Sequence, residues 1–490
     1  MLKKQRQAGV LLHISSLPSG GNSQGSLGKN AFRFVDFLSE VGAKVWQMLP
    51  LNMPHVDGSP YQCLSAHAGN PAFISMAVLS EQHWLSAEDL VSYETNQTQE
   101  YKQLLIENVY STFNLISTSV QRQAFKQFCR KQSGWLDDFA IFLVLRKQFN
   151  QLTWNQWPAP YKNRDAKALK QIKKLHSVEI DVIKFTQFLF FRQWAALKKY
   201  ANQKGVAMFG DIPIFVAYDS ADVWANPRLF KLDKRCNMKV VAGVPPDYFS
   251  ATGQRWGNPH YKWSVMKEDG YKWWLSRMAT QNSLFDMLRI DHFRGLQAAW
   301  EIPAREETAM NGQWRRAPGA ALLGAIKERF PKICLVAEDL GIITPQVNAL
   351  RAKFKLPGMK ILHFAFGGGD DNYYLPANIE ANSVVYTGTH DNDTSLGWYN
   401  TLEFNAKQHL QAIFGNILPN MPHDLVSLAL NTKANLAIIP MQDVLALDGT
   451  HRMNTPGTIE NNWLWHFEWS QLTTELKQQF SQAIQQSGRA

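Results

Sequence analysis

Apolar residues gather in short runs along the chain, and stretches with helical spacing separate most of these runs. Eight runs are rich in β-branched residues and have the length of buried strands. They cover residues 10–14, 45–51, 206–216, 287–293, 334–340, 359–366, 383–390 and 436–444. Helical spacing is found in 32–38, within 121–149, and in 185–200, 320–330 and 345–354. This alternation predicts an α/β fold, a (β/α)8 TIM barrel with mainly helical insertions over its carboxyl-terminal face.

Two intervals between the predicted strands are too long for simple connections. Residues 52–205 contain several extra helical patterns, and residues 217–286 begin with a loop rich in proline, glycine and aromatic residues. Loops at the carboxyl ends of barrel strands carry function in this architecture. We therefore predict one barrel over residues 1–490, a largely helical insertion at 52–205 after the second strand, and an insertion with an active-site loop at 217–286 after the third.

The composition indicates where such a protein works. The chain has 490 residues, of which 45% are hydrophobic, enough for a large core. Its four cysteines lack the paired spacing of zinc ribbons or disulfide frameworks, which indicates a reducing compartment. The apolar run near the N-terminus is too short for a signal peptide, and no stretch reaches the length of a membrane span. We predict a soluble, cytoplasmic protein with no membrane partner.

The formal net charge of +10 raises the possibility of a nucleic-acid partner. The basic residues are spread along the chain, however, and no zinc-finger, helix-turn-helix or RNA-binding signature accompanies them. A solvated basic surface is the favoured interpretation, and no nucleic acid is predicted as a partner. The seventeen tryptophans are more informative, because their flat faces suit sugar rings or nucleobases, although tryptophan also fills cores.

Charged side chains concentrate in the segment RIDHFRG at residues 289–295, which follows an apolar-leaning stretch. Arg289, Asp291, His292 and Arg294 all lie within it. Burying unpaired charge is costly, so the cluster is either a satisfied ion-pair network or a working site. The segment by itself favours neither interpretation.

Acidic residues stand at the carboxyl ends of three predicted strands: Asp291 on the fourth, Glu338 on the fifth and Asp391 on the seventh. Neighbouring strands lie about 4.8 Å apart, so the carboxyl groups of Asp291 and Glu338 should be about 5 Å apart if they face the same mouth. Retaining glycosidases use a pair separated by roughly 5–5.5 Å, whereas inverting enzymes need roughly 6.5–9.5 Å to admit a water. The spacing predicts a retaining pair.

The surroundings of the two carboxyl groups predict different roles. Side chains alternate along a strand, so Arg289 shares a face with Asp291 and should lower its pKa, keeping it ionised as a nucleophile requires. Glu338 follows the apolar run 333–337, and burial there should raise its pKa so that it stays protonated as a general acid. Asp339 alternates to the opposite face, where a structural hydrogen-bond acceptor is expected.

Two further segments have both a structural and a functional interpretation. In 387–394, TGTHDNDT, Asp393 or Thr394 is a candidate helix cap, while His390 and Asp391 are candidates for binding sugar hydroxyls. A calcium loop is not supported, because the ligand pattern is absent. The loop 243–259 mixes rings, amides and carboxylates that suit a sugar, or it is a lid that its aromatic residues anchor to the barrel.

Several segments together closely resemble the amylomaltases, the 4-α-glucanotransferases or disproportionating enzymes of glycoside hydrolase family 77. The matching motifs are SPYQ (59–62), GDIPIFVA (210–217), PPDYFSATGQRWGNP (245–259), RIDHFRG (289–295), AEDLG (337–341), GTHDNDT (388–394) and MNTPGT (453–458). They span almost the whole chain. In combination they are highly specific, although one motif alone, such as AEDLG, is weak.

The resemblance implies a retaining transglycosylase with Asp291 as nucleophile, Glu338 as acid and base, and Asp391 as the carboxylate that stabilises the distorted donor sugar. By the same matches Tyr61 would stack on that sugar, while Arg289 and His390 would contact it. The loop that closes over the glucan would contribute Asp247, Gln254 and Trp256. The other implied substrate-binding residues are Ser59, Asp211 and Asn462, and the alternative for Asp211 is a role only in orienting its neighbours.

The resemblance also implies partners and chemistry. Donors would be α-1,4-glucans, such as maltooligosaccharides, glycogen or starch chains, and the acceptor would be glucose or another maltooligosaccharide. The family uses no metal and no organic cofactor. An α-1,4-glucan hydrolase of the same fold and a catalytically inactive glycan-binding protein are the alternatives. The chain departs from residues common in the family at Val56, His67, Ala299, Ala377 and Asn461, and none of these is one of the three carboxylates.

Overall fold

The centre of the molecule is an eight-stranded sheet in a computed structural model that describes residues 5–19, 24–246, 250–415 and 417–490. The strands pair in the order β10-β11-β12-β1-β2-β3-β6-β9, and every pairing is parallel. Their bounds are β1 Gln7–Leu11, β2 Val45–Gln47, β3 Ala207–Ile212, β6 Met287–Ile290, β9 Cys334–Ala337, β10 Gly358–Ile361, β11 Ser383–Tyr386 and β12 Leu436–Pro440.

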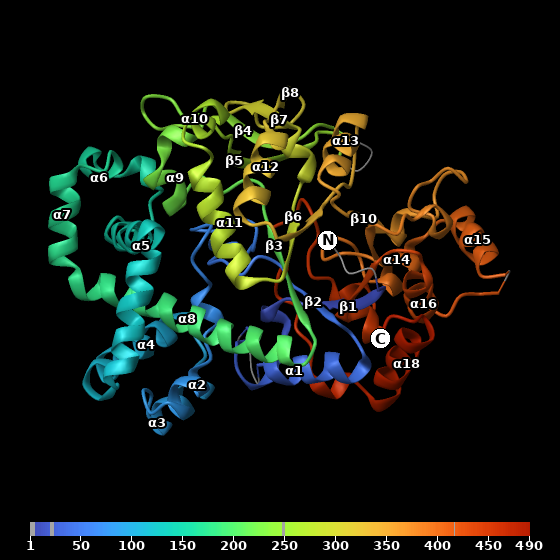
Figure 1. The fold of residues 1–490 in the computed structure, drawn as a ribbon, viewed down its shortest axis with the longest axis horizontal. Coiled ribbons are helices and arrows are strands. Elements are labelled where there is room, and N and C mark those ends of the chain that lie inside the picture. Colours follow the sequence, from blue (N-terminus) through green and yellow to red (C-terminus); the bar gives the residue numbers. More distant parts are fainter. Residues whose placement is uncertain (1–4, 20–23, 247–249, 416) are drawn as a thin grey trace.

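The two edge strands of this sheet, β9 and β10, approach each other. The backbone N–H of Ala337 donates to the carbonyl of Pro357 at 2.9 Å, and the N–H of Met359 donates to the Asp339 carboxylate at 2.7 Å. The sheet is therefore nearly closed into a barrel, with β1, β2, β3 and β6 in the middle of Figure 1 and helices around them. The predicted (β/α)8 barrel is confirmed.

All eight predicted strands are present, and each of them ends earlier than predicted. The third, expected over 206–216, covers Ala207–Ile212, and the seventh, expected over 383–390, covers Ser383–Tyr386. The residues beyond these ends leave the hydrogen-bonded ladder and form the mouth of the barrel. Apolar composition continues into the mouth, so the sequence pattern could not mark the point where pairing stops.

Helices cover the barrel and fill the long interval between β2 and β3. Their bounds are α1 Lys29–Val41, α2 Met76–Glu81, α3 Ala87–Thr95, α4 Gln99–Ile116, α5 Ser119–Gln148, α6 Ala159–Lys162, α7 Ala166–Leu175, α8 Ser177–Gln203, α9 Ala221–Ala225, α10 Trp263–Glu268, α11 Lys272–Leu284, α12 Gly319–Arg329, α13 Pro345–Lys353, α14 Ser395–Thr401, α15 Phe404–Ile413, α16 His423–Asn431, α17 Met441–Val444 and α18 Thr474–Gln486. The predicted helical segments coincide with α1, α5, α8, α12 and α13.

The helices α2 to α8 form a helical layer at the left of Figure 1. Aromatic rings join α4, α5 and α8 there: Phe113 lies 4.8 Å from Phe185, and Phe125 lies 5.5 Å from Phe188, measured between ring centres. Such ring pairs add to the hydrophobic gain of burial. Many of the aromatic residues thus serve as core, as their alternative interpretation allowed. The division into one barrel and two insertions, at 52–205 and 217–286, stays a prediction.

A second, smaller sheet was not predicted. It is antiparallel, in the order β5-β4-β7-β8, with β4 Val240–Val244, β5 Gln254–Pro259, β7 Ala298–Pro303 and β8 Gln313–Arg316. All residues of β8 are exposed, so the strand lacks the alternation of buried and exposed positions that signals a strand in a sequence. This sheet holds the segment with Gln254 and Trp256.

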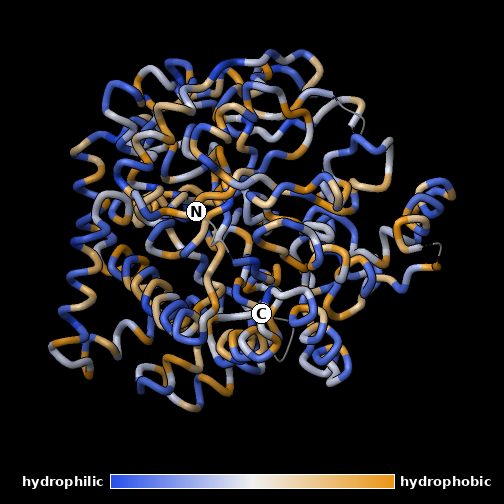
Figure 2. Tube along the Cα trace, turned by 45° about the vertical axis from the view of Figure 1, so that its right-hand side comes forward, coloured by the Kyte–Doolittle hydropathy of each residue, from blue (hydrophilic) through white to orange (hydrophobic). Residues whose placement is uncertain are grey.

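Hydrophobic and hydrophilic residues alternate along the peripheral helices, as expected for helices with one face on the barrel (Figure 2). In α1, the buried positions include Phe34, Leu38 and Val41, which follow helical spacing. Across the part of the chain that the structure describes, no helix has the length and apolar character needed to cross a membrane.

Candidate active site

Asp291 and Glu338 lie side by side at the carboxyl ends of two paired strands. Each directly follows its strand, and the last residues of these strands, Ile290 and Ala337, are partners in the β6–β9 register. The backbone N–H of His292 donates to Glu338 Oε2 at 2.6 Å, and the N–H of Leu340 donates to Oε1 at 2.9 Å. The backbone of His292, the residue after Asp291, therefore holds the Glu338 carboxyl group in place.

The backbone at His292 makes this contact possible. His292 has a φ of 49°, in the left-handed region that residues other than glycine seldom adopt. The turn leads the chain out of β6 and directs the His292 N–H at Glu338. Strained conformations of this kind are kept where the surroundings over-determine them, often at functional sites.

Arg289 connects two carboxylates beneath the mouth. Its NH1 lies 2.6 Å from Asp211 Oδ2 on β3, and its NH2 lies 2.9 Å from Asp291 Oδ1. The arginine and Asp211 are buried, whereas the Asp291 side chain keeps 28% of its exposure. Within RIDHFRG, Arg289 and Asp291 thus belong to one ion-pair network with Asp211, and Asp291 faces the mouth. Arg294 instead donates to the backbone carbonyl of Ile342.

A second branch of the network runs from Asp211 to the loop after β11. The Tyr61 hydroxyl donates to Asp211 Oδ2 at 2.7 Å, and its oxygen lies 2.9 Å from His390 Nε2. Because the Tyr61 proton points to Asp211, its oxygen accepts a hydrogen bond, which places a proton on His390 Nε2. Burial lowers the pKa of His390, so the ring is neutral at pH 7. The two rings stack with centres 5.3 Å apart.

Asp391 is the most exposed of the three candidate carboxylates, with a side chain 45% exposed. Its Oδ2 lies 3.4 Å from His390 Nε2, and the Asn454 amide donates to its Oδ1 at 2.7 Å. Arg452 donates to the backbone carbonyl of Asp391 at 3.2 Å. The carboxylate is oriented by its neighbours while remaining open on one side.

The charge states differ in part from those expected. Burial raises the pKa of Glu338, as predicted, against the opposing effects of Arg289 and of two backbone N–H donors. The prediction that Arg289 keeps the pKa of Asp291 low is wrong. Burial raises the pKa of Asp291 to about 8, and Arg289 offsets only part of that rise because Asp211 and Glu338 act in the opposite direction. The sequence shows that Arg289 lies close to Asp291, but it does not show how deeply Asp291 is buried.

Four other predicted site residues make contacts outside the ion-pair network. Ser59 accepts a hydrogen bond from the Tyr61 N–H at 3.3 Å and so shapes the turn that presents Tyr61. Trp256 contacts the His292 ring edge to face, with centres 4.8 Å apart, and its Nε1 donates to Gln254 Oε1 at 3.1 Å. Asn462 uses its amide on the backbone of Thr455 and Thr458. Asp247 lies outside the described residues.

The structure adds residues that the sequence did not single out. Trp463 packs against the Tyr61 and His390 rings, with centres 6.0 and 6.1 Å away. Asn454, which orients Asp391, belongs to the motif MNTPGT, but its partner was not apparent from the sequence. His13 follows β1, and burial lowers its pKa to about 3, with His390 as a second cause. The available signal for His13 was a polar residue within the apolar run 10–14.

Of the two interpretations left open at 387–394, the structure confirms the helix cap, and sugar binding by His390 and Asp391 stays a prediction. Thr394 caps α14, since its side chain accepts a hydrogen bond from the Gly397 N–H at 3.1 Å, which confirms the cap. His390 and Asp391, earlier in the same segment, join the network described above. Asp339 accepts from Met359 N–H and pairs with Arg351 at 3.2 Å, as expected of a structural acceptor.

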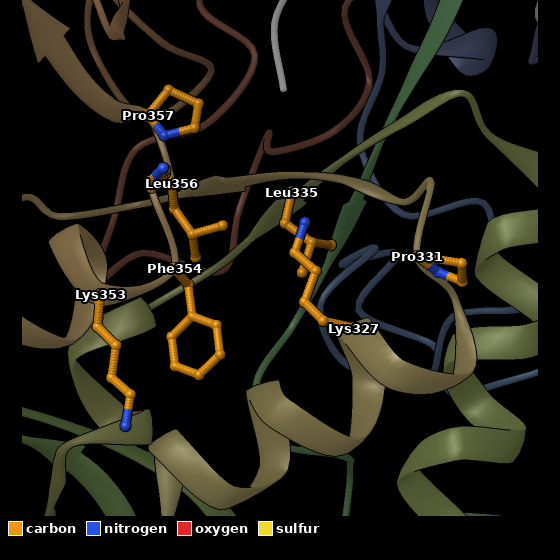
Figure 3. Close-up of a pocket in the computed structure, with 8 residues that line it drawn as sticks. Lys327, Pro331, Leu335, Lys353, Phe354, Leu356 and Pro357 are labelled. Carbon is orange, nitrogen blue, oxygen red and sulfur yellow. The ribbon is translucent and has the colours of Figure 1, made fainter.

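A separate cavity of about 320 Å³ lies at the opposite, amino-terminal end of β9 and β10 (Figure 3). Leu335, Leu356 and Phe354 contribute apolar lining, and Lys327 and Lys353 also line it. Figure 3 shows the side chains of Lys327 and Lys353 extending in opposite directions, so their charges do not converge on one point. No group of three His, Cys, Asp or Glu side chains within the described ranges is placed to hold a metal ion.

Comparison with known proteins agrees with this arrangement. A family model described as 4-alpha-glucanotransferase matches residues 12–473. The chain belongs to this family. A 4-alpha-glucanotransferase from Thermus thermophilus is 44% identical over 488 residues and covers 96% of each chain. The potato enzyme, named 4-alpha-glucanotransferase, chloroplastic/amyloplastic, is 42% identical and covers 94% of this chain and 82% of its own.

Solved structures extend the comparison to three dimensions. An amylomaltase from Streptococcus agalactiae in complex with acarbose superposes with a TM-score of 0.95 at 34% identity, covering 99% of this chain and 100% of that one. An amylomaltase from Corynebacterium glutamicum shares the fold, with a TM-score of 0.78 at 19% identity, and covers 98% of this chain and 75% of its own.

Proposed function

We propose a retaining, two-step mechanism for this chain, which as a member of its family is a 4-α-glucanotransferase. It transfers segments of α-1,4-glucans between maltooligosaccharides, or from them to glucose, through a covalent glucosyl–aspartate intermediate. The observation that carries the proposal is the pair Asp291 and Glu338, which directly follow adjacent parallel strands and share the His292 backbone. Carboxyl groups that follow paired strands, which lie about 4.8 Å apart, suit a nucleophile and an acid rather than a pair with a water between them.

We assign Asp291 as nucleophile and Glu338 as general acid. Burial raises the pKa of both groups, and the Glu338 charge raises that of Asp291 further, so a proton on Glu338 favours ionised Asp291. A proton on Glu338 keeps the ion pair between Arg289 and Asp291 at 2.9 Å, and a proton on Asp291 removes it. The state with ionised Asp291 and protonated Glu338 is the one that the first step requires.

In the first step, Asp291 attacks the anomeric carbon of the donor while Glu338 protonates the departing glycosidic oxygen. Positive charge develops on the sugar ring in the transition state, and Asp391, open toward the mouth, is placed to stabilise it. Tyr61 and neutral His390, whose rings stack, would bind the donor sugar beside it. Arg289 and Asp211 hold Asp291 in place from below.

In the second step, Glu338 removes a proton from the 4-hydroxyl of an acceptor glucan, which displaces Asp291 and restores an α-1,4 bond. Transfer to sugar rather than water depends on acceptor binding energy. Trp256 supplies a ring next to His292, and Gln254 is bonded to that indole. We propose that Asp247, Gln254 and Trp256 bind the acceptor side, and that Ser59 and Asn462 support the donor side through the turns they shape.

Incubation of the protein with maltotriose tests the function. Transfer should give glucose together with a ladder of maltooligosaccharides longer than maltotriose, separated by chromatography. Maltose and glucose alone would instead identify an α-1,4-glucan hydrolase. Absence of any product, with maltotriose still bound, would identify a glycan-binding protein.

The proposed location is the cytoplasm. All four cysteines are free thiols, which fits a reducing compartment. The substrates of the proposed reaction, maltooligosaccharides with glycogen or starch chains, are the partners we assign. Cell fractionation followed by the maltotriose assay tests the location, since activity confined to the membrane or secreted fraction would contradict it.

A further inference from the structure

A buried carboxylate outside the mouth holds both ends of the segment that carries His390 and Asp391. Asp443 lies on α17, directly after β12, and its side chain is 3% exposed. Thr387, which follows β11, donates its hydroxyl to Asp443 Oδ2 at 2.6 Å. Ser395, the first residue of α14, donates its hydroxyl to the same oxygen at 2.6 Å and its backbone N–H to Oδ1 at 2.8 Å.

The segment between these two attachment points is residues 388–394, which projects His390 and Asp391 toward the mouth. It has its own internal bonds: Asn392 Oδ1 accepts from the Thr389 N–H and hydroxyl, both at 2.8 Å. These bonds shape the tip of the segment. The Asp443 side chain links both ends of the segment to the barrel.

His363 completes the attachment on one side. Its Nε2 lies 3.0 Å from the Ser395 hydroxyl oxygen, which accepts because its own proton goes to Asp443. The His363 ring stacks on Trp398 of α14, with centres 4.5 Å apart. A side chain at Gly388 would come within 2.7 Å of that ring, so the segment begins where only glycine fits. The attachment is tightly packed as well as hydrogen-bonded.

We propose that Asp443 is a positioning residue for glucan transfer, which sets the placement of His390 and Asp391 by joining Thr387 to Ser395. The proposal rests on the proposed function, since it assumes that His390 and Asp391 act on the donor sugar. Three hydrogen bonds to one buried carboxyl group join the two ends of the segment, so losing any of them should let the ends shift. A displacement of about 1 Å at a reacting centre lowers a rate on the order of 100-fold.

The substitution Asp443→Asn tests the proposal. Its amide nitrogen must replace one of the two acceptor oxygens, so at least one of the three hydrogen bonds is lost and the attachment is weakened. We expect kcat for maltotriose disproportionation to fall by about 10- to 100-fold, with less than about a threefold change in KM. Thr387→Val should lower kcat by a smaller factor, and Thr387→Ser, which keeps the hydroxyl, should restore it.

Asp286→Asn is the matched control. Asp286 also accepts a backbone N–H, from Met208 at 2.8 Å, and a side-chain amide, from Asn202 at 2.9 Å, but it precedes β6 at the amino-terminal end of the barrel. The control should lower the unfolding temperature and leave kcat within about twofold. Equal losses of kcat in Asp443→Asn and Asp286→Asn would overturn the proposal, because they would indicate a general loss of stability.

A double-mutant comparison separates this proposal from the proposed function. If Asp443 acts through the segment, Asp443→Asn should lower kcat much less in a His390→Ala background than in the wild-type background. Full additivity would overturn the positioning role while leaving the site intact. If His390→Ala and Asp391→Asn themselves keep normal activity, the site assignment fails instead. Should Asp443→Asn not fold, Thr387→Val and its Thr387→Ser rescue still decide the question.

Discussion

The barrel mouth and the helical layer each bury a cation, but only the cation at the mouth forms ion pairs among the described residues. Arg289 at the mouth pairs with Asp211 at 2.6 Å and with Asp291 at 2.9 Å. Lys102 on α4 is 3% exposed, donates to the carbonyl of Ala72 at 2.6 Å, and lies 5.8 Å from the centre of the Tyr93 ring. None of the ion pairs found among the described residues involves Lys102.

The pKa values follow from these partners. The carboxylates around Arg289 raise its pKa well above the ordinary value in spite of burial. Burial lowers the pKa of Lys102 to about 7, with no carboxylate to oppose it. An ion pair offsets part of the free energy that burying a charge costs, as Asp291 does for Arg289. Burial of Lys102 in the helical layer lowers stability, and no ion pair offsets it.

The largest expected effect is on catalysis at the mouth. Asp291→Asn keeps the shape of the side chain but removes the attacking charge, so kcat with maltotriose should fall by at least about 1,000-fold. Circular dichroism should show an unchanged fold, and maltotriose binding, measured by calorimetry, should remain detectable. Turnover within about tenfold of the wild type would contradict the nucleophile assignment.

The next effect distinguishes a paired from an unpaired cation. Arg289→Met leaves Asp211 and Asp291 without their counter-charge, which should lower the free energy of unfolding by about 3–5 kcal/mol and also abolish activity. Denaturant unfolding followed by tryptophan fluorescence measures the stability. The matched control is the substitution of the buried cation in the helical layer, Lys102→Met, which should raise the free energy of unfolding.

Lys102→Met should stabilise the protein, by about 2 kcal/mol at pH 7, because it removes a buried charge and loses one hydrogen bond. The gain depends on pH. Between pH 7 and 10.5 the unfolded chain binds more protons at Lys102 than the folded chain does, so wild-type stability rises with pH there. The advantage of the variant should therefore be complete below pH 7 and shrink toward pH 10.5. A gain that does not change between pH 6.5 and pH 9 would contradict this account.

The smallest effect concerns the aromatic residues of the two regions. Trp256 is half-buried at the mouth, where its ring contacts His292, whereas Phe185 in the helical layer packs against Phe113. Trp256→Ala should raise KM for glucose as acceptor about two- to tenfold, with little change in stability. Phe185→Ala should instead destabilise the fold by about 3–5 kcal/mol without changing KM. The reverse pattern would indicate that Trp256 is only a packing residue.

The sequence determined the number and order of the barrel strands, because each of them is a short apolar run. It also placed Asp291 and Glu338 at the strand ends, since a parallel barrel brings all carboxyl ends to one mouth. The motifs in RIDHFRG, AEDLG and GTHDNDT identified the family before any contact was known.

Only the tertiary structure decided how deep those residues lie and what they touch. Burial depends on segments distant in sequence, so the raised pKa of Asp291 could not be read from its neighbour Arg289. The contacts from Asp443 to Thr387 and Ser395 join β12 to β11 and α14. No local pattern encodes a hydrogen bond between such segments, because it arises only when the barrel brings them together.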